Sequence, residues 1–212
     1  MFTGLVEELG KIESFTRQGG AARVTVVAPQ VTGRVCIGDS VAVDGVCLTV
    51  TTVEGDQFTA DVMPQTLTLS TLGGLSAGCV VNVERAITPT RQLGGHLVQG
   101  HVDAVGLLLA RRPGDQCEVL RISLPPQLAM YVVPQGPIAV DGVSLTVVGV
   151  GGRWFDVSLI PTTLRDTGLG AKPTGAAVNL EADVLSKYMY RHLQHYLSHH
   201  PLLPYGVSER AR

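Results

Sequence analysis

The chain has 212 residues, of which 45% are hydrophobic and 16% charged, with a net charge of −2. A composition this apolar is typical of a packed globular protein and excludes a disordered chain. The nearly balanced charge, without a basic stripe, argues against binding to nucleic acid. The first residues show neither a basic stretch nor a long apolar run. We therefore expect no signal peptide, no membrane span and a cytoplasmic location.

Short β-branched segments bounded by Gly, Pro or Asp follow one another along most of the chain. We expect strands at 23–27, 40–52, 80–84 and 156–160, and loops at 33–39 and 135–137. The dipeptides Asp44-Gly45 and Asp141-Gly142 fall between apolar runs and predict tight hairpin turns in which glycine takes a positive φ. Because no helical crossover separates the strands, the pattern favours a small antiparallel barrel in each half.

The strand pattern occurs twice. Residues 41–50 return as 138–147 with eight of ten positions identical, at an offset of 97. Further identities continue the match, at an offset of 96 near the start of each half. Repeats of solenoids and propellers are about 20–50 residues long, so this one indicates a duplicated domain. We expect two domains, at 1–92 and 93–183, that each hold one copy of the same ligand.

The C-terminal part departs from this pattern. Apolar residues at helical spacing predict an amphipathic helix over 184–200, with Asp183 directly before it as a candidate N-cap. Copies of the helix or the chain's own barrels are the two candidates for covering its apolar stripe. The long, heptad-like stripe favours self-association. Residues 201–212 form a tail that we expect to be disordered after Pro204.

Residues repeated in both halves are candidates for a shared pocket. Threonine hydroxyls and exposed strand backbone suit a flat heterocycle rich in carbonyl and N–H groups. Ordinary threonines on a solvated barrel face are the alternative, but their repetition beside both Asp-Gly turns favours a pocket. The candidates are Thr49 and Thr146, Thr66 and Thr163, the flanking Leu48 and Leu145, and the backbone of the segments from Asp61 and from Ser158.

Other equivalent positions differ in their chemistry. The pairs are Cys47 and Ser144, Leu5 and His101, Ala86 and Asp183, and Gln65 and Thr162. A thiol, a hydroxyl, an imidazole and a carboxylate can together perform nucleophilic addition and proton transfer. Structural roles stay open for the same groups: Cys47 as a small buried hydrophobe, Asp183 as a helix cap and His101 as a hydrogen-bonded structural histidine.

No set of residues has the spacing of a metal site. The four cysteines form no CxxC pair and do not repeat at the domain offset, which argues against a zinc site or a disulfide framework. His96 is expected only to stabilise the turn between the domains. The remaining histidines lie on the predicted helix and are expected to form a solvated face, because no carboxylate or cysteine joins them; they are His192, His195, His199 and His200.

Several motifs, in order and at the right spacing, resemble those of the riboflavin synthase family. They are residues 1–7 (MFTGLVE), 45–50 (GVCLTV), 82–86 (NVERA), 94–103 (GGHLVQGHVD) and 141–147 (DGVSLTV). The resemblance spans roughly residues 1–185. It implies an all-β chain of two six-stranded Greek-key barrels with a C-terminal helix, and a homotrimer whose helices bundle.

The resemblance also implies a reaction. Two molecules of 6,7-dimethyl-8-ribityllumazine dismutate by transfer of a four-carbon unit, giving riboflavin and 5-amino-6-ribitylaminouracil, without cofactor or metal. The site would lie between the N-terminal barrel of one subunit and the C-terminal barrel of the next. Holding both lumazines face to face would remove most of the entropic cost of a bimolecular step. Lumazine synthase is a candidate partner.

Residue by residue, the resemblance implies a reaction centre closed by Phe2 and containing Cys47, His101, Ser144, Thr146 and Asp183. The family's ligand-lining positions match Gly4, Leu5, Val6, Leu48, Thr49, Asp61, Val62, Met63, Pro64, Gln65, Thr66, Gly100, Val102, Gln135, Leu145, Ser158, Leu159, Ile160, Pro161, Thr162 and Thr163. We expect Ser144, Thr146 and Asp183 to act at one lumazine. Cys47 and His101 are expected to act at the other.

Three positions depart from the family pattern. The family usually has lysine at Gln135 and commonly has glutamate at Gln65 and Thr162. Loss of the lysine removes a cation expected to reach across the subunit boundary, which affects how the ligand is polarised.

Three other functions compete with the enzyme. They are a non-catalytic lumazine or flavin carrier of the antenna type, a flavin-binding reductase barrel and a structural module. Both halves retain their Leu-Thr-Val and Pro-x-Thr-Leu segments, which favours the enzyme over a carrier. A reductase would need a nucleotide-binding βαβ unit with a glycine-rich turn, and the sequence shows none.

Overall fold

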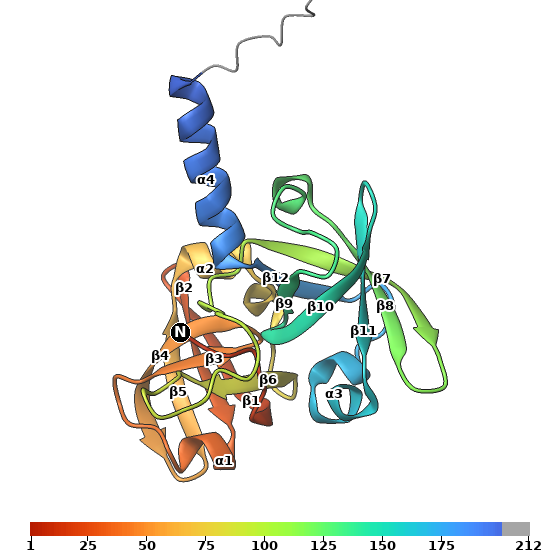
Figure 1. Ribbon diagram of the computed structural model, residues 1–212. Coiled ribbons are helices and arrows are strands. Elements are labelled where there is room, and N and C mark those ends of the chain that lie inside the picture. Colours follow the sequence, from red (N-terminus) through yellow and green to blue (C-terminus); the bar gives the residue numbers. More distant parts are fainter. Residues whose placement is uncertain (201–212) are drawn as a thin grey trace, which may run out of the picture.

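The computed structural model describes residues 1–200, and the predicted tail at 201–212 lies outside them. Within this range the strands form two closed, six-stranded antiparallel barrels side by side, which confirms the predicted fold class (Figure 1). The first barrel consists of β1 (Glu8–Gln18), β2 (Ala21–Val27), β3 (Ser40–Val43), β4 (Val46–Glu54), β5 (Gln57–Val62) and β6 (Val80–Arg85). The second consists of β7 (Ala104–Pro113), β8 (Glu118–Ser123), β9 (Pro137–Val140), β10 (Val143–Val150), β11 (Trp154–Leu159) and β12 (Ala177–Ala182).

The two barrels have the same strand order. Around the first barrel it is β1-β2-β5-β4-β3-β6, and around the second β7-β8-β11-β10-β9-β12. In each, three strands joined by hairpins lie beside an earlier strand, which is the Greek-key arrangement. Even the irregularities repeat: β1 has a bulge between Ile12 and Ser14, and β7 has one between Leu108 and Ala110. The duplication is therefore visible in the position of single bulge residues as well as in the strand order.

Short helices fill the connections in each barrel. They are α1 (Pro29–Thr32), α2 (Pro64–Leu69), η1 (Thr71–Gly74), η2 (Pro126–Leu128), α3 (Pro161–Asp166) and η3 (Gly168–Gly170). None of them was predicted from the sequence. Four of them begin with proline, as at Pro64 and Pro161, where its missing N–H costs no hydrogen bond, and this was their signal.

The two predicted hairpin turns exist, and they meet at the junction of the barrels. Asp44 and Gly45 have φ of 45° and 77°, and Asp141 and Gly142 have 46° and 77°. Positive φ at both central residues is the geometry that matches the twist of paired strands. The turns are in direct contact: a Cβ atom on Gly45 would lie 2.5 Å from the backbone nitrogen of Gly142.

Buried amides lock this junction in the same way on both sides. Asn82 donates from Nδ2 to the carbonyl of Asp141 at 2.9 Å, and Asn179 donates to the carbonyl of Asp44 at 2.8 Å. Within residues 1–200, Lys172 forms an ion pair with Asp141 but not with Asp44. Burial, together with the neighbouring Asp141 carboxylate, raises the pKa of Asp44 to about 7.

The predicted C-terminal helix is α4 (Val184–His199), and it projects from the barrels (Figure 1). The Asp183 side chain accepts a hydrogen bond from the backbone N–H of Leu185 at 3.1 Å, so the predicted N-cap is confirmed. The apolar side chains of the predicted stripe are open to solvent, and Met189 is 72% exposed. None of the helices within residues 1–200 is long and apolar enough to cross a membrane.

Candidate active site

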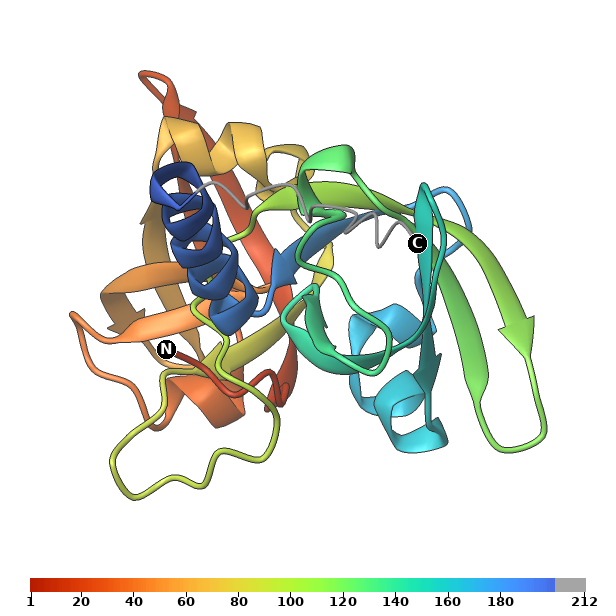
Figure 2. The same cartoon turned by 45° about the horizontal axis from the view of Figure 1, so that its top comes forward.

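Two equivalent segments pass between the barrels. We call residues 1–7 the N-terminal arm and residues 97–103 the second arm; each precedes the first strand of a barrel. The arms pair with each other, because Phe2 donates its N–H to the carbonyl of Val98 at 2.6 Å and Val98 donates back at 3.2 Å. Figure 2 shows the chain looping along the first barrel, in yellow-green, before it reaches this junction.

Each arm contacts the strand of the opposite barrel that holds a candidate reactive residue, Cys47 or Ser144. Cys47, at the start of β4, donates its N–H to the carbonyl of Gly100 in the second arm at 2.8 Å. Ser144, at the start of β10, makes the same bond to the carbonyl of Gly4 in the N-terminal arm, also at 2.8 Å. The two half-sites are therefore built crosswise, with one wall of each supplied by the arm of the other half.

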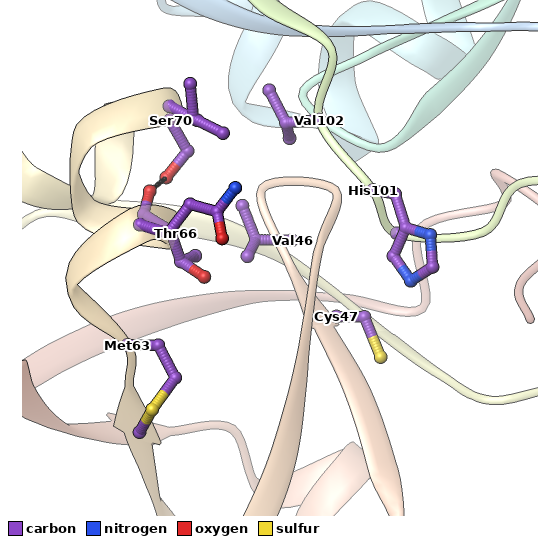
Figure 3. A pocket seen from close by; sticks show the side chains of 10 residues that line it. Val46, Cys47, Met63, Thr66, Ser70, His101 and Val102 are labelled. Carbon is purple, nitrogen blue, oxygen red and sulfur yellow. Dashed lines mark hydrogen bonds between the residues drawn. The ribbon is translucent and has the colours of Figure 1, made fainter.

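On the first barrel this arrangement encloses a cavity of about 480 Å³ (Figure 3). Its volume falls within the range of about 300–1,000 Å³ that is usual for sites of small organic ligands. Seven predicted site residues line it: Cys47, Met63, Gln65, Thr66, Gly100, His101 and Val102. Three lining residues escaped the sequence analysis, namely Val46, Leu69 and Ser70.

Ser70 had a signal in the sequence. It lies four residues after Thr66, at the end of α2, and its hydroxyl donates to the Thr66 carbonyl at 2.6 Å. Because α2 was not predicted from the sequence, the four-residue spacing that brings Thr66 and Ser70 together was not used. Figure 3 shows these residues on the α2 side of the cavity, with Cys47 and His101 on the other. The cavity thus offers hydroxyl and amide groups on one wall and a thiol with an imidazole on the opposite one.

The second half-site has a different set of groups. His96 Nδ1 lies 2.7 Å from the hydroxyl of Ser144, within hydrogen-bond distance. His96 Nε2 is buried, without a hydrogen-bond partner among residues 1–200. Burial lowers the pKa of His96, although the Asp183 carboxylate acts in the opposite direction. The imidazole is therefore neutral near pH 7 and able to exchange a proton with the Ser144 hydroxyl.

This contact changes the interpretation of His96. We expected it only to stabilise the turn between the domains, but it is the hydrogen-bond partner of Ser144. Sequence spacing gave no indication of this contact, because 48 residues separate the two positions. Ser144, Thr146 and Asp183 do not line the cavity of the first barrel. Within one chain, the two predicted groups of reactive residues thus do not meet in the cavity of the first barrel.

The remaining predicted site residues fall into three environments. Leu48, Val62, Leu145 and Leu159 point into the barrel cores, so only their backbone is placed to meet a ligand. Phe2 is fully buried in a small cluster between the barrels, and Val6 packs against the second core. Exposed or half-buried are Leu5, Thr49, Asp61, Pro64, Gln135, Thr146, Ser158, Ile160, Pro161, Thr162 and Thr163.

Two of the exposed residues have further features. Asp61 forms an ion pair with Arg23 at 2.8 Å, so its carboxylate is already engaged. Gln135 has a left-handed backbone with φ of 64°. Among residues 1–200 there is no group of three His, Cys, Asp or Glu side chains placed to hold a metal ion.

Comparison with known proteins agrees with this arrangement. A family model described as lumazine binding domain matches the chain twice, at residues 3–86 and 99–183. The riboflavin synthase of Mycobacterium tuberculosis is 53% identical over 195 residues, covering 90% of this chain and 97% of that one. The chain belongs to the riboflavin synthase family. This confirms the family resemblance noted in the sequence.

More distant members of the riboflavin synthase family match over the same length. The protein of Bacillus subtilis is 42% identical, covering 91% of this chain and 90% of its own. That of Schizosaccharomyces pombe is 38% identical, covering 89% and 91%. A solved structure of LumP complexed with 6,7-dimethyl-8-(1'-D-ribityl) lumazine has a TM-score of 0.78 at 23% identity, covering 86% of this chain and 99% of that chain. At this identity the likeness shows a shared fold.

Proposed function

We propose that the chain is a riboflavin synthase that dismutates two molecules of 6,7-dimethyl-8-ribityllumazine. One lumazine gives a four-carbon unit to the other, and the products are riboflavin and 5-amino-6-ribitylaminouracil. The observation that carries the proposal is the pair of half-sites, equivalent in backbone and different in chemistry. One substrate bound twice, in two chemical roles, requires such a pair. The reaction is a group transfer, and we propose that it needs no cofactor or metal.

The residues divide between the two lumazines. One lumazine must lose a proton from its C7 methyl group, and the other must accept a nucleophile at its C7. We assign Ser144, Thr146 and Asp183 to one of these lumazines and Cys47 with His101 to the other. The neutral imidazole of His96, bonded to Ser144, supports the first group because it can take up or return a proton. Phe2, in the N-terminal arm, helps to close the site.

We further propose that a complete site forms between subunits of a homotrimer. Among residues 1–200, the lining of the first-barrel cavity comes from that barrel and the second arm. This supports a site that is completed by the second half-site of another copy. The exposed stripe of α4, with Leu185, Tyr188 and Met189 all more than half exposed, is the surface proposed to hold the copies together.

A cytoplasmic location, tested by cell fractionation, and lumazine synthase as a partner, tested by co-purification, belong to the same proposal. The departures from the family pattern bear on the ligand. Gln65 lines the cavity and offers an amide where a carboxylate is common. We propose that the ligand is therefore polarised by neutral groups at Gln65, Thr162 and Gln135.

The alternative of a non-catalytic carrier has less support. Relatives that are 38–53% identical over most of the chain are riboflavin synthases, whereas LumP is 23% identical. The reactive positions of both half-sites are also filled by groups able to add to carbon or move protons.

A turnover assay separates the enzyme from the carrier. Purified protein is mixed with 6,7-dimethyl-8-ribityllumazine in the presence of a chelator and without added cofactor, and riboflavin is followed by its absorbance. We expect turnover, with two lumazines consumed for each riboflavin formed. Binding of the lumazine without riboflavin formation would overturn the enzyme in favour of the carrier. Turnover that stops on chelation would overturn metal independence.

A further inference from the structure

Two buried glutamates occupy equivalent positions on β6 and β12. Glu84 and Glu181 are each only 3% exposed. Each lies two strands from the reactive residue of its own barrel, Glu84 in the row of Cys47 and Glu181 in the row of Ser144. From strand register alone, each glutamate would be expected to serve the half-site of its own barrel.

The contacts of Glu181 lead to the other barrel instead. Its carboxylate accepts three backbone N–H bonds from the second arm, from Gln99 at 2.6 Å, Gly100 at 2.9 Å and His101 at 2.8 Å. Gly100 in turn accepts the N–H of Cys47, and His101 lines the cavity of the first barrel. The carboxylate of Glu181, which belongs to the second barrel, thus holds the arm that forms one wall of the first half-site.

Glu84 makes the equivalent contacts with the N-terminal arm. It accepts the backbone N–H of Thr3 at 2.8 Å, the hydroxyl of Thr3 at 2.6 Å and the N–H of Gly4 at 3.0 Å. The carbonyl of Gly4 accepts the N–H of Ser144. A carboxylate rooted in the first barrel thus fixes the arm against the second half-site.

The backbone of each arm packs closely against the opposite barrel. A Cβ atom on Gly100 would lie 2.6 Å from Cβ of Cys47, and one on Gly4 would lie 2.5 Å from Cβ of Ser144. The backbone of each arm is therefore pressed directly against the reactive residue. Loss of the bonds that hold the arm displaces groups that touch the chemistry.

We propose that Glu181 is a positioning residue for the half-site of Cys47 and His101, and that Glu84 positions the half-site of Ser144. Each carboxylate acts across the junction, on the barrel in which it does not lie. The proposal rests on the proposed function in treating these two surfaces as the substrate half-sites. Its geometric part, the control of each arm by the opposite barrel, can be tested without any turnover.

A carboxylate is needed because both of its oxygens accept. In Glu181, Oε1 accepts from Gln99, and Oε2 accepts from Gly100 and His101. Glutamine has the same shape but presents an NH₂ group at one of these positions, where it faces an N–H donor. Glu181→Gln therefore leaves at least one buried donor unpaired and releases part of the arm. Glu84→Gln does the same to the N-terminal arm.

The thiol of Cys47 reports on the second arm directly. The full-length protein and the two variants Glu181→Gln and Glu84→Gln are treated with iodoacetamide, and labelling at each cysteine is followed by mass spectrometry. We expect Glu181→Gln to raise the labelling rate of Cys47 by about tenfold, because loss of the hydrogen bonds shifts local opening of the arm. Glu84→Gln should leave that rate unchanged.

Cys79 and Cys117, both half-buried, serve as internal references in the first and second barrels. A rise at all three cysteines would mean general unfolding. Glu181→Asp is then measured, because it keeps the charge and perturbs the fold less; it must raise labelling at Cys47 alone. Faster labelling of Cys47 in Glu84→Gln but not in Glu181→Gln would overturn the crosswise assignment. No selective change in any Glu181 variant would overturn it as well.

Turnover then tests the positioning role. In Glu181→Gln we expect kcat for riboflavin formation to fall by about 100-fold, since displacement of reacting groups by about 1 Å has effects of this size. KM should change much less, and Glu181→Asp should recover part of kcat. Selective labelling with unchanged kcat would overturn the positioning role. A wild-type protein without turnover would overturn the proposed function, while the labelling result would still decide the crosswise control of the arms.

Discussion

The two barrels are alike in backbone and unlike at the positions that we propose to do the chemistry. Both close with the same strand order, and their Asp-Gly turns and asparagines interlock symmetrically at the junction. The first half-site presents the thiol of Cys47 and the imidazole of His101. The second presents the hydroxyl of Ser144 bonded to His96. A duplicated scaffold thus holds two surfaces in equivalent frames while their side chains take different roles.

The same contrast appears in the buried charges of the junction. Asp44 and Asp141 are equivalent, yet Lys172 pairs with Asp141, and the position equivalent to Lys172 in the first half is Leu75. Two buried carboxylates therefore lie near one partly exposed cation. The strand order is the same in both halves but the buried charges are not, and we expect this difference to affect stability.

The largest expected effect is the loss of turnover when His101 is replaced by the residue at the equivalent position of the N-terminal arm. His101→Leu gives the second arm the residue that stands at Leu5 in the N-terminal arm. We expect kcat to fall by about 10²–10³-fold, the usual contribution of a group that transfers protons. Binding of the lumazine, measured by fluorescence titration, should persist because the cavity walls remain. Full turnover in this variant would remove His101 from the mechanism.

Substitution at the touching turns should affect both halves equally. Gly45→Ala and Gly142→Ala each place a methyl group within 2.7 Å of backbone atoms of the opposite turn, at a positive φ. We expect each to lower the free energy of unfolding by roughly 3 kcal/mol, from strain at φ and from overpacking. Urea denaturation measures both. Clearly unequal losses would contradict a symmetric junction.

Replacing each of the two buried aspartates with asparagine should change stability in opposite directions. Asp141→Asn leaves Lys172 without its carboxylate and should destabilise the protein by about 2 kcal/mol, less than for a fully dry pair because the lysine side chain is 23% exposed. Asp44→Asn keeps the acceptor for the N–H of Asn82 and tolerates the positive φ. At pH 8 it should stabilise the protein by on the order of 2 kcal/mol.

The pH dependence gives the sign of the Asp44 effect. The folded protein keeps a proton on Asp44 up to its pKa of about 7, whereas the unfolded chain releases it near the ordinary aspartate pKa of 3.8. The contribution of Asp44 to stability therefore decreases as pH rises between these values and is constant above them. Urea denaturation at pH 5 and pH 8 should show a smaller loss of stability in Asp44→Asn than in wild type. An equal loss would contradict the raised pKa.

The smallest expected change in stability comes from variants of Asp183, which distinguish its capping role from its role in turnover. Its side chain caps α4 and acts on the pKa of His96, while the equivalent Ala86 does neither. Asp183→Ala should cost about 1 kcal/mol of stability through loss of the cap. Asp183→Asn retains the cap and should leave thermal unfolding nearly unchanged, while turnover falls in both variants. Normal turnover in Asp183→Asn would leave Asp183 with the capping role alone.

The sequence predicted the backbone better than the contacts between the halves. Identity at an offset of 97, alternating apolar residues and Asp-Gly dipeptides were sufficient for two barrels and their turns, because these features depend on local patterns. Helical spacing placed α4 correctly from Val184, and Asp183 was identified as its cap.

The site could be predicted only in part. Cys47 and His101 share a cavity, as expected of residues assigned to the same lumazine. The bond from His96 to Ser144 and the bonds from Glu181 to the second arm span 48 to 82 residues, and no periodicity encodes them. They arise from how the barrels pack, which a one-dimensional pattern does not contain. Leu48 and Leu145 were predicted as site residues because they flank other candidates in the sequence. Their side chains, however, face the barrel cores.

Mixed oligomers test most directly whether two unlike half-sites from different subunits form one active site. A His101→Leu chain and a Ser144→Ala chain, each nearly inactive alone, are co-expressed with different tags and purified through both. In the mixed oligomer an intact first half-site meets an intact second half-site, so riboflavin formation should rise well above that of either variant. Activity no higher than that of the separate variants, in an oligomer shown to contain both chains, would contradict the account.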